Sequence, residues 1–143
     1  MKLKISEETL AHIENHAQAE YPNECCGFLY GVEADDRVID HAIEAKNSKE
    51  GDKRRRFEIS PLDYLKAEQY AVENDLQLLG IYHSHPNHPA RPSEHDRVQA
   101  VEFFSYIITS VEEDKINTTT SWRLNEQKQF VQEEINTLTA SKV

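Results

Sequence analysis

The stretch IYHSHPNHPARPSEHD, residues 81–96, holds four histidines, three prolines and two acids in sixteen positions. It continues an apolar run, LQLLGIYHSH at 76–85, which predicts a buried β-strand that ends in the histidines. Side chains two apart on a strand share a face, so His83 and His85 are expected to converge. Two such imidazoles suit a metal ion, which needs each nitrogen at ~2.0–2.1 Å. The H-x-H pair alone is a weak signal, because exposed strand ends also carry it.

The residues that follow the histidines offer a third ligand. Ser93 is placed to begin a helix over 93–103 after a loop stiffened by prolines, and Asp96 would lie one turn into that helix. Two histidines, Asp96 and a water would form the four-coordinate arrangement of a catalytic zinc site. The same S-x-x-D spacing also matches a capping box, in which Ser93 caps the helix and Asp96 reaches back to it. Spacing leaves both interpretations open.

The remaining chain predicts strands that alternate with helices. Ser6 and Ser60 are candidate N-caps, and Pro61 suits a first helical position. The predicted helices are 6–21 and 60–75. The predicted strands are 3–5, 25–32, 37–45, 55–60 and 105–111, with a closing hairpin over 118–135 that turns near 125–128. This order indicates an α/β (α+β) domain with a mostly buried sheet.

Length and composition are those of one globular unit. The chain has 143 residues, of which 38% are hydrophobic and 29% are charged, so a single domain over 1–143 is expected. Membrane insertion is not expected, because no run approaches the ~18 apolar residues of a membrane span. The segment MKLKISEETL lacks the apolar core of a secretory signal, which predicts a cytoplasmic protein. Two adjacent cysteines give no disulfide framework.

The net charge of the chain limits the classes of binding partner that are expected. The net charge is −10, which argues against nucleic acid as a partner, because phosphate binding needs a basic face. The exception is the basic run 53–56, KRRR. It is either a solvated loop or a docking patch for an acidic partner.

The ligand spacing resembles a known family. Residues 83–96 match H-[S/T]-H-P-x6-S-x-x-D, the signature of the JAMM (MPN+) zinc metalloproteases. The segment PNECCGFLYG at 22–31 resembles the one that supplies a glutamate in bacterial members, and the likeness to the compact bacterial branch runs over 24–111. The resemblance implies a three-layer α/β/α JAMM/MPN domain, similar to cytidine deaminases, with a mixed central sheet.

The resemblance also implies a site. His83, His85 and Asp96 would bind one Zn²⁺ per chain, with a water completing the shell. Glu24 would take a proton from that water and pass it to the leaving amine, and Ser93 would donate to the oxyanion. The assignment of Glu24 rests on the family likeness alone.

Two further residues are candidates for substrate contact. On a strand, Cys26 would share a face with Glu24, so it is either a small core residue or a contact to a sulfur-bearing substrate end. Arg91 is either a surface arginine or a clamp for a substrate carboxylate. His88 and His95 are expected to be solvated or at the rim of the site rather than ligands.

Compact bacterial JAMM relatives cut after the Gly-Gly tail of small ubiquitin-like sulfur-carrier proteins. The resemblance therefore implies a metallopeptidase acting on a peptide or isopeptide bond of such a carrier. Two alternatives stay open. One is a non-catalytic MPN scaffold; the other is a JAMM peptidase with a different peptide substrate, such as those that accompany phage-tail and cell-wall modules.

Overall fold

Strand β4 (Gln77–Pro86) is buried from its third residue onward and lies at the middle of the sheet. The computed structural model describes residues 2–139. On one side β4 pairs antiparallel with β2 (Cys26–Glu33), and on the other it pairs parallel with β5 (Ser105–Glu112). This position explains the continuous apolar run in the sequence, since a central strand covered on both faces has no exposed side.

The sheet is mixed and closes on itself. Strand β3 (Arg37–Ala45) pairs with β2, and β6 (Lys115–Leu124) joins β5 to β7 (Phe130–Leu138). Strand β1 (Lys2–Ser6) then pairs in parallel with both β3 and β7, which completes the order β1-β3-β2-β4-β5-β6-β7. The sequence predicts the strands but not this closure, because the hydrophobic pattern of a strand does not determine which other strands it pairs with.

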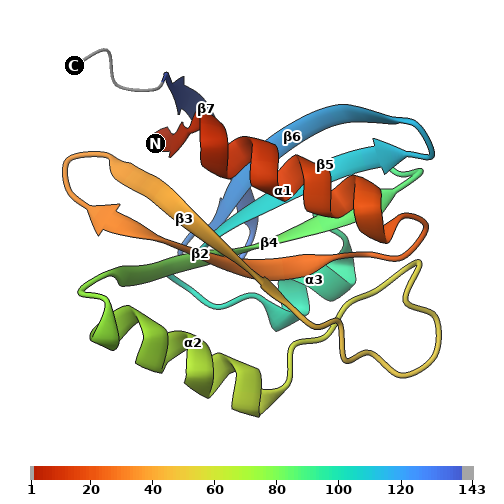
Figure 1. Cartoon of the computed structure of the whole chain (residues 1–143), viewed down its shortest axis with the longest axis horizontal. Helices are drawn as coiled ribbons and strands as arrows, with labels where there is room; N and C mark the ends of the chain where they lie inside the picture. The colour runs from red at the N-terminus through yellow and green to blue at the C-terminus, as the bar shows by residue number, and fades with distance from the viewer. Residues whose placement is uncertain (1, 140–143) are drawn as a thin grey trace.

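Helices cover both faces of the sheet, as Figure 1 shows. Helix α1 (Glu7–Glu20) lies on one side, and α2 (Pro61–Glu73) and the short α3 (Glu94–Gln99) lie on the other. Successive side chains along each strand point to opposite faces of the sheet, so they belong to two separate hydrophobic cores. Leu29 and Tyr82 pack in the core beneath α1, whereas Ile81 packs in the core beneath α2. The predicted layered α/β class is confirmed.

The predicted helix starts are confirmed by their caps. The Ser6 hydroxyl accepts from the Thr9 N–H at 3.1 Å, and the Ser60 hydroxyl accepts from the Asp63 N–H at 3.1 Å. Pro61 occupies the first turn of α2, where its missing N–H costs no hydrogen bond. The hairpin between β6 and β7 is also present, turning over residues 125–129.

Two predicted elements differ from the structure. Residues 55–60 do not form a strand. This segment instead hydrogen-bonds locally, with the Ser48 N–H donating to the Glu58 carbonyl at 2.9 Å, and it leads into the cap of α2. Helix α3 ends at Gln99 rather than reaching 103, because Ala100 has the extended angles φ −68° and ψ 143°.

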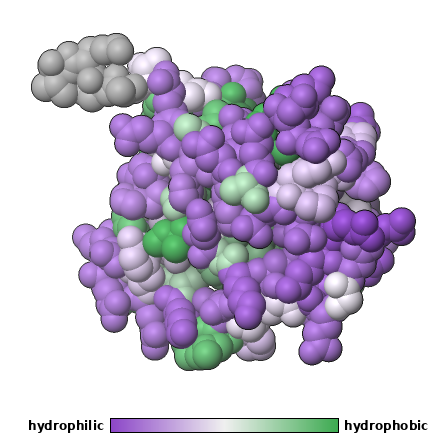
Figure 2. All heavy atoms as spheres, turned by 45° about the vertical axis from the view of Figure 1, so that its right-hand side comes forward, coloured by the Kyte–Doolittle hydropathy of each residue, from purple (hydrophilic) through white to green (hydrophobic). Residues whose placement is uncertain are grey.

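The surface follows the composition. The face in Figure 2 is mostly hydrophilic, with apolar areas of limited extent between charged side chains. Within residues 2–139, no helix combines the length and the apolar character that crossing a membrane requires.

Candidate metal centre

The end of β4 places two imidazoles side by side. His83 and His85 lie two residues apart on β4, so both project from the face that α2 and α3 cover. His83 is 1% exposed and His85 is 7% exposed. The pairing strands flank them, with Cys26 of β2 opposite His83 and Ser110 of β5 beside His85.

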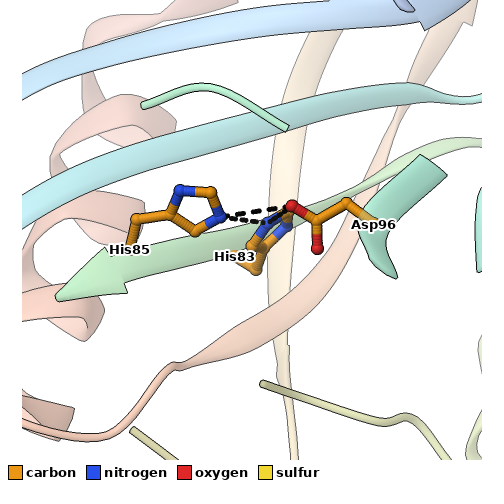
Figure 3. Close-up of side chains that lie close together, drawn as sticks. All are labelled: His83, His85 and Asp96. Atoms are coloured by element: carbon orange, nitrogen blue, oxygen red, sulfur yellow. Dashed lines mark hydrogen bonds and ion pairs between the residues drawn. The ribbon is translucent and has the colours of Figure 1, made fainter. Parts of the chain in front are cut away.

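Asp96 of α3 completes a cluster of three ligand atoms, seen in Figure 3. Its Oδ2 lies 3.3 Å from His83 Nε2 and 3.2 Å from His85 Nε2, and the two Nε2 atoms are 3.2 Å apart. Donor atoms held at ~2.0–2.1 Å from one tetrahedral ion lie ~3.3–3.4 Å from one another. The three atoms therefore fit three corners around a zinc ion and leave the fourth open for water.

The capping box and the ligand cluster exist together. The Ser93 Oγ accepts from the Asp96 N–H at 3.0 Å, and the Ser93 N–H donates to Asp96 Oδ2 at 2.9 Å. The carboxylate oxygen that closes the box is the one that faces both imidazoles. The two interpretations of the S-x-x-D spacing are therefore compatible, since the cap fixes the carboxylate in position for the histidines.

Hydrogen bonds set the protonation of the imidazoles. His85 Nδ1 lies 2.8 Å from the Pro89 carbonyl, which can only accept, so Nδ1 carries the proton and Nε2 presents its lone pair to the cluster. Burial lowers the pKa of His83. For His85 burial acts in the same direction, but hydrogen bonds to Asp96 and to Pro89 raise its pKa overall. Burial would raise the pKa of Asp96, yet the charges and hydrogen bonds of the imidazoles hold it well below its usual range.

Glu24 lies just before β2 and is positioned through the backbone. The Ser84 hydroxyl accepts from the Cys25 N–H at 2.8 Å, which ties this segment to β4 beyond its regular pairing. The Glu24 N–H donates to the Lys53 carbonyl at 2.7 Å, and the Asn47 amide donates to the Glu24 carbonyl at 3.0 Å. The strand and the 46–60 loop thus clamp Glu24 from both sides.

The Glu24 carboxyl is buried without a complete set of partners. Glu24 is 5% exposed, and its Oε1 has no hydrogen-bond partner among the residues that the structure describes. Burial raises the pKa of Glu24 to about 8, although His85 nearby acts against the rise. A buried carboxyl with an unused oxygen and a pKa near neutrality can both take and release a proton at physiological pH.

Two clefts border the cluster. One, of about 380 Å³, is mainly aromatic and aliphatic and reaches His83 and Asp96. The other, of about 590 Å³, is polar and basic and reaches His85, Ser93 and Glu24. The three ligand residues are thus divided between the linings of the two clefts. The arrangement suits hydrolysis of a bond in an extended substrate.

The other predicted site residues lie nearby in different surroundings. Cys26 is 0% exposed, its thiol contacts the Ala45 carbonyl at 3.8 Å, and burial raises its pKa. Arg91 is exposed and lines the basic cleft. His88 and His95 line the same cleft and lie outside the three-atom cluster.

Phe57 is a neighbour of the site that the sequence did not single out. Its ring stacks on His83, with ring centroids 4.5 Å apart and planes 29° from parallel. It comes from the irregular 55–60 segment, which lies outside the sheet and covers the histidine. The alternation of that segment predicts a strand, so the sequence carried no signal for this contact.

Comparison with known proteins places the chain in a family. Residues 6–125 match the family described as prokaryotic homologs of the JAB domain. The chain belongs to this family. A JAB1/MPN domain protein from Archaeoglobus fulgidus has the same fold, with 25% identity and a TM-score of 0.57 over 92% of this chain and 97% of that one. The resemblance to the JAMM proteins is therefore confirmed.

Two other relatives of this JAB-domain chain are a bacterial protein of known structure and a phage tail protein. A Desulfitobacterium hafniense protein solved in solution is 29% identical, with a TM-score of 0.85 over 98% of this chain and 95% of that one. The tail tip assembly protein K of Escherichia phage N15 is 34% identical over 95 residues, which is 66% of this chain and 35% of that protein. The chain thus spans about a third of the length of this curated relative.

Proposed function

We propose that this JAB-domain chain is a zinc metallopeptidase that hydrolyses the peptide or isopeptide bond after the Gly-Gly C-terminus of a ubiquitin-like sulfur-carrier protein. The observation that carries the proposal is the triangle of His83 Nε2, His85 Nε2 and Asp96 Oδ2, whose sides of 3.2–3.3 Å match the spacing of zinc ligands. The donor set, two histidines and a carboxylate, is one that catalytic zinc sites use.

Zinc held there would polarise the scissile carbonyl and lower the pKa of a bound water toward ~7. Glu24 would accept the proton of that water on its free Oε1 and pass it to the leaving amine. The Ser93 Oγ already accepts from the Asp96 N–H, so its own hydroxyl proton is available to donate to the developing oxyanion.

The substrate class is supported by the family likeness and by the compactness of the site. The connection from α3 to β5 is short, with Gln99 and Ser105 as its flanking residues. It lacks room for the insertion by which eukaryotic JAMM deubiquitinases grip a second ubiquitin. A small carrier with a flexible Gly-Gly tail could thread that tail across the ligand cluster, between the two clefts.

The test begins with zinc content, measured by elemental analysis on protein purified without chelator. Wild type should hold about one zinc per chain, and Asp96→Ala should lose it, because two imidazoles alone leave the site incomplete. A carrier extended beyond Gly-Gly is then incubated with both proteins, and its mass is followed. Cleavage after Gly-Gly by wild type alone is the expected result. A wild type that takes up no zinc even after reloading would reject the proposal in favour of a scaffold.

A second candidate is a peptidase of phage-tail assembly, favoured by the likeness to the phage N15 tail tip protein. The same zinc site would then act on a different peptide. Zinc-loaded protein that leaves every Gly-Gly carrier intact but cuts a tail-protein or cell-wall peptide would establish this alternative.

A further inference from the structure

The second half of β3 has an open edge in the described part of the chain. Its pairing with β1 covers residues 37–39 only, whereas its pairing with β2 on the other side continues to Ala45. Within residues 2–139, no backbone hydrogen bond reaches residues 40–45 from the side of β1. A strand edge of this kind presents unpaired N–H and C=O groups to which another extended chain can bind.

An apolar cavity of about 290 Å³ lies beside this edge. Helix α2 packs over β2 and β4, and it leaves Ile43 and Ala45 of β3 only half-buried. These two side chains point to the face of the sheet that α2 covers, and both line the cavity. Aromatic rings form a large part of the remaining lining, namely Phe28, Tyr30 and Tyr70. A cavity of this size and character suits one large apolar side chain.

The mouth of the cavity carries two lysines that have no acid partner in the described part of the chain. The lysines that form ion pairs within residues 2–139 are Lys4, Lys49 and Lys128. Lys46 and Lys66 line the cavity and are not among them. Their ammonium groups are therefore available to a ligand.

The two acids of the lining do not balance both lysines. Glu44 reaches the opposite face of the sheet, where its carboxylate lies 3.6 Å from His12 Nε2 and 3.7 Å from His16 Nε2 of α1. Asp63 lies in the first turn of α2, where the helix dipole stabilises its carboxylate. Two lysines thus face one acid at the mouth, and this excess of positive charge favours a ligand that carries a carboxylate.

We propose that residues 40–45 of β3 bind an extended peptide of a partner protein, which adds to the sheet as a further strand, places an apolar side chain in the cavity and brings an acidic side chain to Lys46 or Lys66. Main-chain hydrogen bonds give affinity in this mode of binding, and the cavity selects the sequence. Among the described residues, none lines both this cavity and a cleft beside the metal cluster. The docking site is therefore separate from the proposed peptidase centre and does not depend on its activity.

The test uses the wild-type protein and a fluorescent peptide, Thr-Val-Thr-Phe-Thr-Asp-Thr, whose Val, Phe and Asp share one face of a strand. We expect saturable binding by fluorescence anisotropy and slower hydrogen exchange of the amides at 40–45. Replacing the Phe of the peptide by Ala should weaken binding about tenfold to a hundredfold, because the apolar anchor is lost. Replacing its Asp by Asn should weaken binding about twofold to fivefold. No saturable binding up to about 1 mM peptide would reject the proposal.

Methylation of the peptide backbone separates strand addition from burial of the Phe side chain alone. Alternate N–H groups of a strand face the same neighbour. Methylating one alternate set of peptide nitrogens should therefore abolish binding, whereas methylating the other set should have a much smaller effect. Equal affinities of the two methylated peptides would overturn the pairing with β3. Light scattering of the free protein checks the occupant: a stable dimer that the peptide dissociates would assign the edge to a second copy of the chain instead.

Lys66→Glu tests the charge at the mouth. It should weaken binding of the Asp peptide about fivefold and leave binding of the Asn peptide nearly unchanged. Lys115→Glu is the matched control, because Lys115 is exposed on β6 outside the cavity and the change in net charge is the same. An equal loss in Lys115→Glu would show a long-range charge effect and contradict the role given to Lys66.

Discussion

Two buried polar clusters lie at opposite ends of β4, and they differ in how fully their polar atoms are paired. At the start of the strand, buried Arg37 donates to the Leu79 carbonyl at 3.1 Å and to the Ser105 hydroxyl at 3.0 Å. At the end of the strand, Glu24 Oε1 and His83 Nδ1 have no partner among the described residues.

Glu133 completes the first cluster. Its carboxylate accepts from the hydroxyls of Ser105 and Ser121, each at 2.7 Å, and from Arg123 Nε at 2.6 Å. Buried charges are tolerated when they are paired in this way. A buried carboxyl that is left incomplete, as Glu24 is, has a different purpose. One cluster is fully paired, whereas the other leaves polar atoms unused, as the proposed metal binding and proton transfer require.

The largest effect is expected from Glu24→Gln, which removes the proton carrier but keeps the shape. Activity should fall by about 10²–10⁴ while zinc content stays at the wild-type level, because Gln cannot accept the proton. Single-turnover cleavage and elemental analysis of the same sample check this. Full residual activity would contradict the role given to Glu24.

Ser93→Ala tests the residue that caps α3 and for which an oxyanion role is proposed. Loss of an oxyanion donor is expected to lower kcat by about 10²–10³, whereas loss of the cap costs about 1 kcal/mol of stability. Measuring kcat at a temperature well below the unfolding midpoint separates the loss of catalysis from the loss of stability. A variant that unfolds earlier but turns over at the wild-type rate would leave Ser93 as a helix cap only.

Glu133→Gln applies the same chemical change to the fully paired cluster. It removes the charge that Arg123 faces, and we expect a loss of about 1.5–3 kcal/mol in the free energy of unfolding. Denaturant unfolding measures this loss, and zinc content measured beside it should not change. Loss of zinc in Glu133→Gln would show that the two clusters are coupled through β4.

The smallest effect concerns pH and the metal-free protein. The pKa of Glu24 is raised by burial to about 8 from 4.5, so the native state binds more protons than the unfolded state between these values. Its contribution to stability is therefore present below about pH 4.5 and is lost as the pH rises through about 8. Between pH 5 and 7 wild type should lose roughly 2 kcal/mol more than Glu24→Gln, because the variant lacks this titration but keeps all the histidines. Parallel unfolding curves for the two proteins would refute the shift.

The sequence predicted those parts of the site that depend on local periodicity. Two-residue alternation placed His83 and His85 on one face, and the S-x-x-D spacing offered either a helix cap or a carboxylate aimed at them, without deciding between the two. The structure shows one oxygen of Asp96 in both positions. A local pattern was sufficient here because all of these atoms belong to one strand, one turn and one short helix.

Contacts between distant segments were not accessible in this way. Glu24 reaches the cluster because β2 pairs with β4, and Ser84 holds the adjoining backbone across that pairing. Only the family likeness indicated Glu24. Buried Arg37 gave no signal either, since arginines on strands are usually exposed and its partners are spread over three other segments.

The closure of the sheet by β1 has a consequence for how the molecule is assembled. Lys2 to Ser6 pair with Glu134 to Leu138, so the ring is joined by segments far apart in sequence. Such pairing is slow to form, and until it forms β3 and β7 each present an unpaired edge. A version trimmed by a few residues at β1 would expose both edges at once. It should associate with other copies even though its candidate metal ligands, which lie on other elements, are all present.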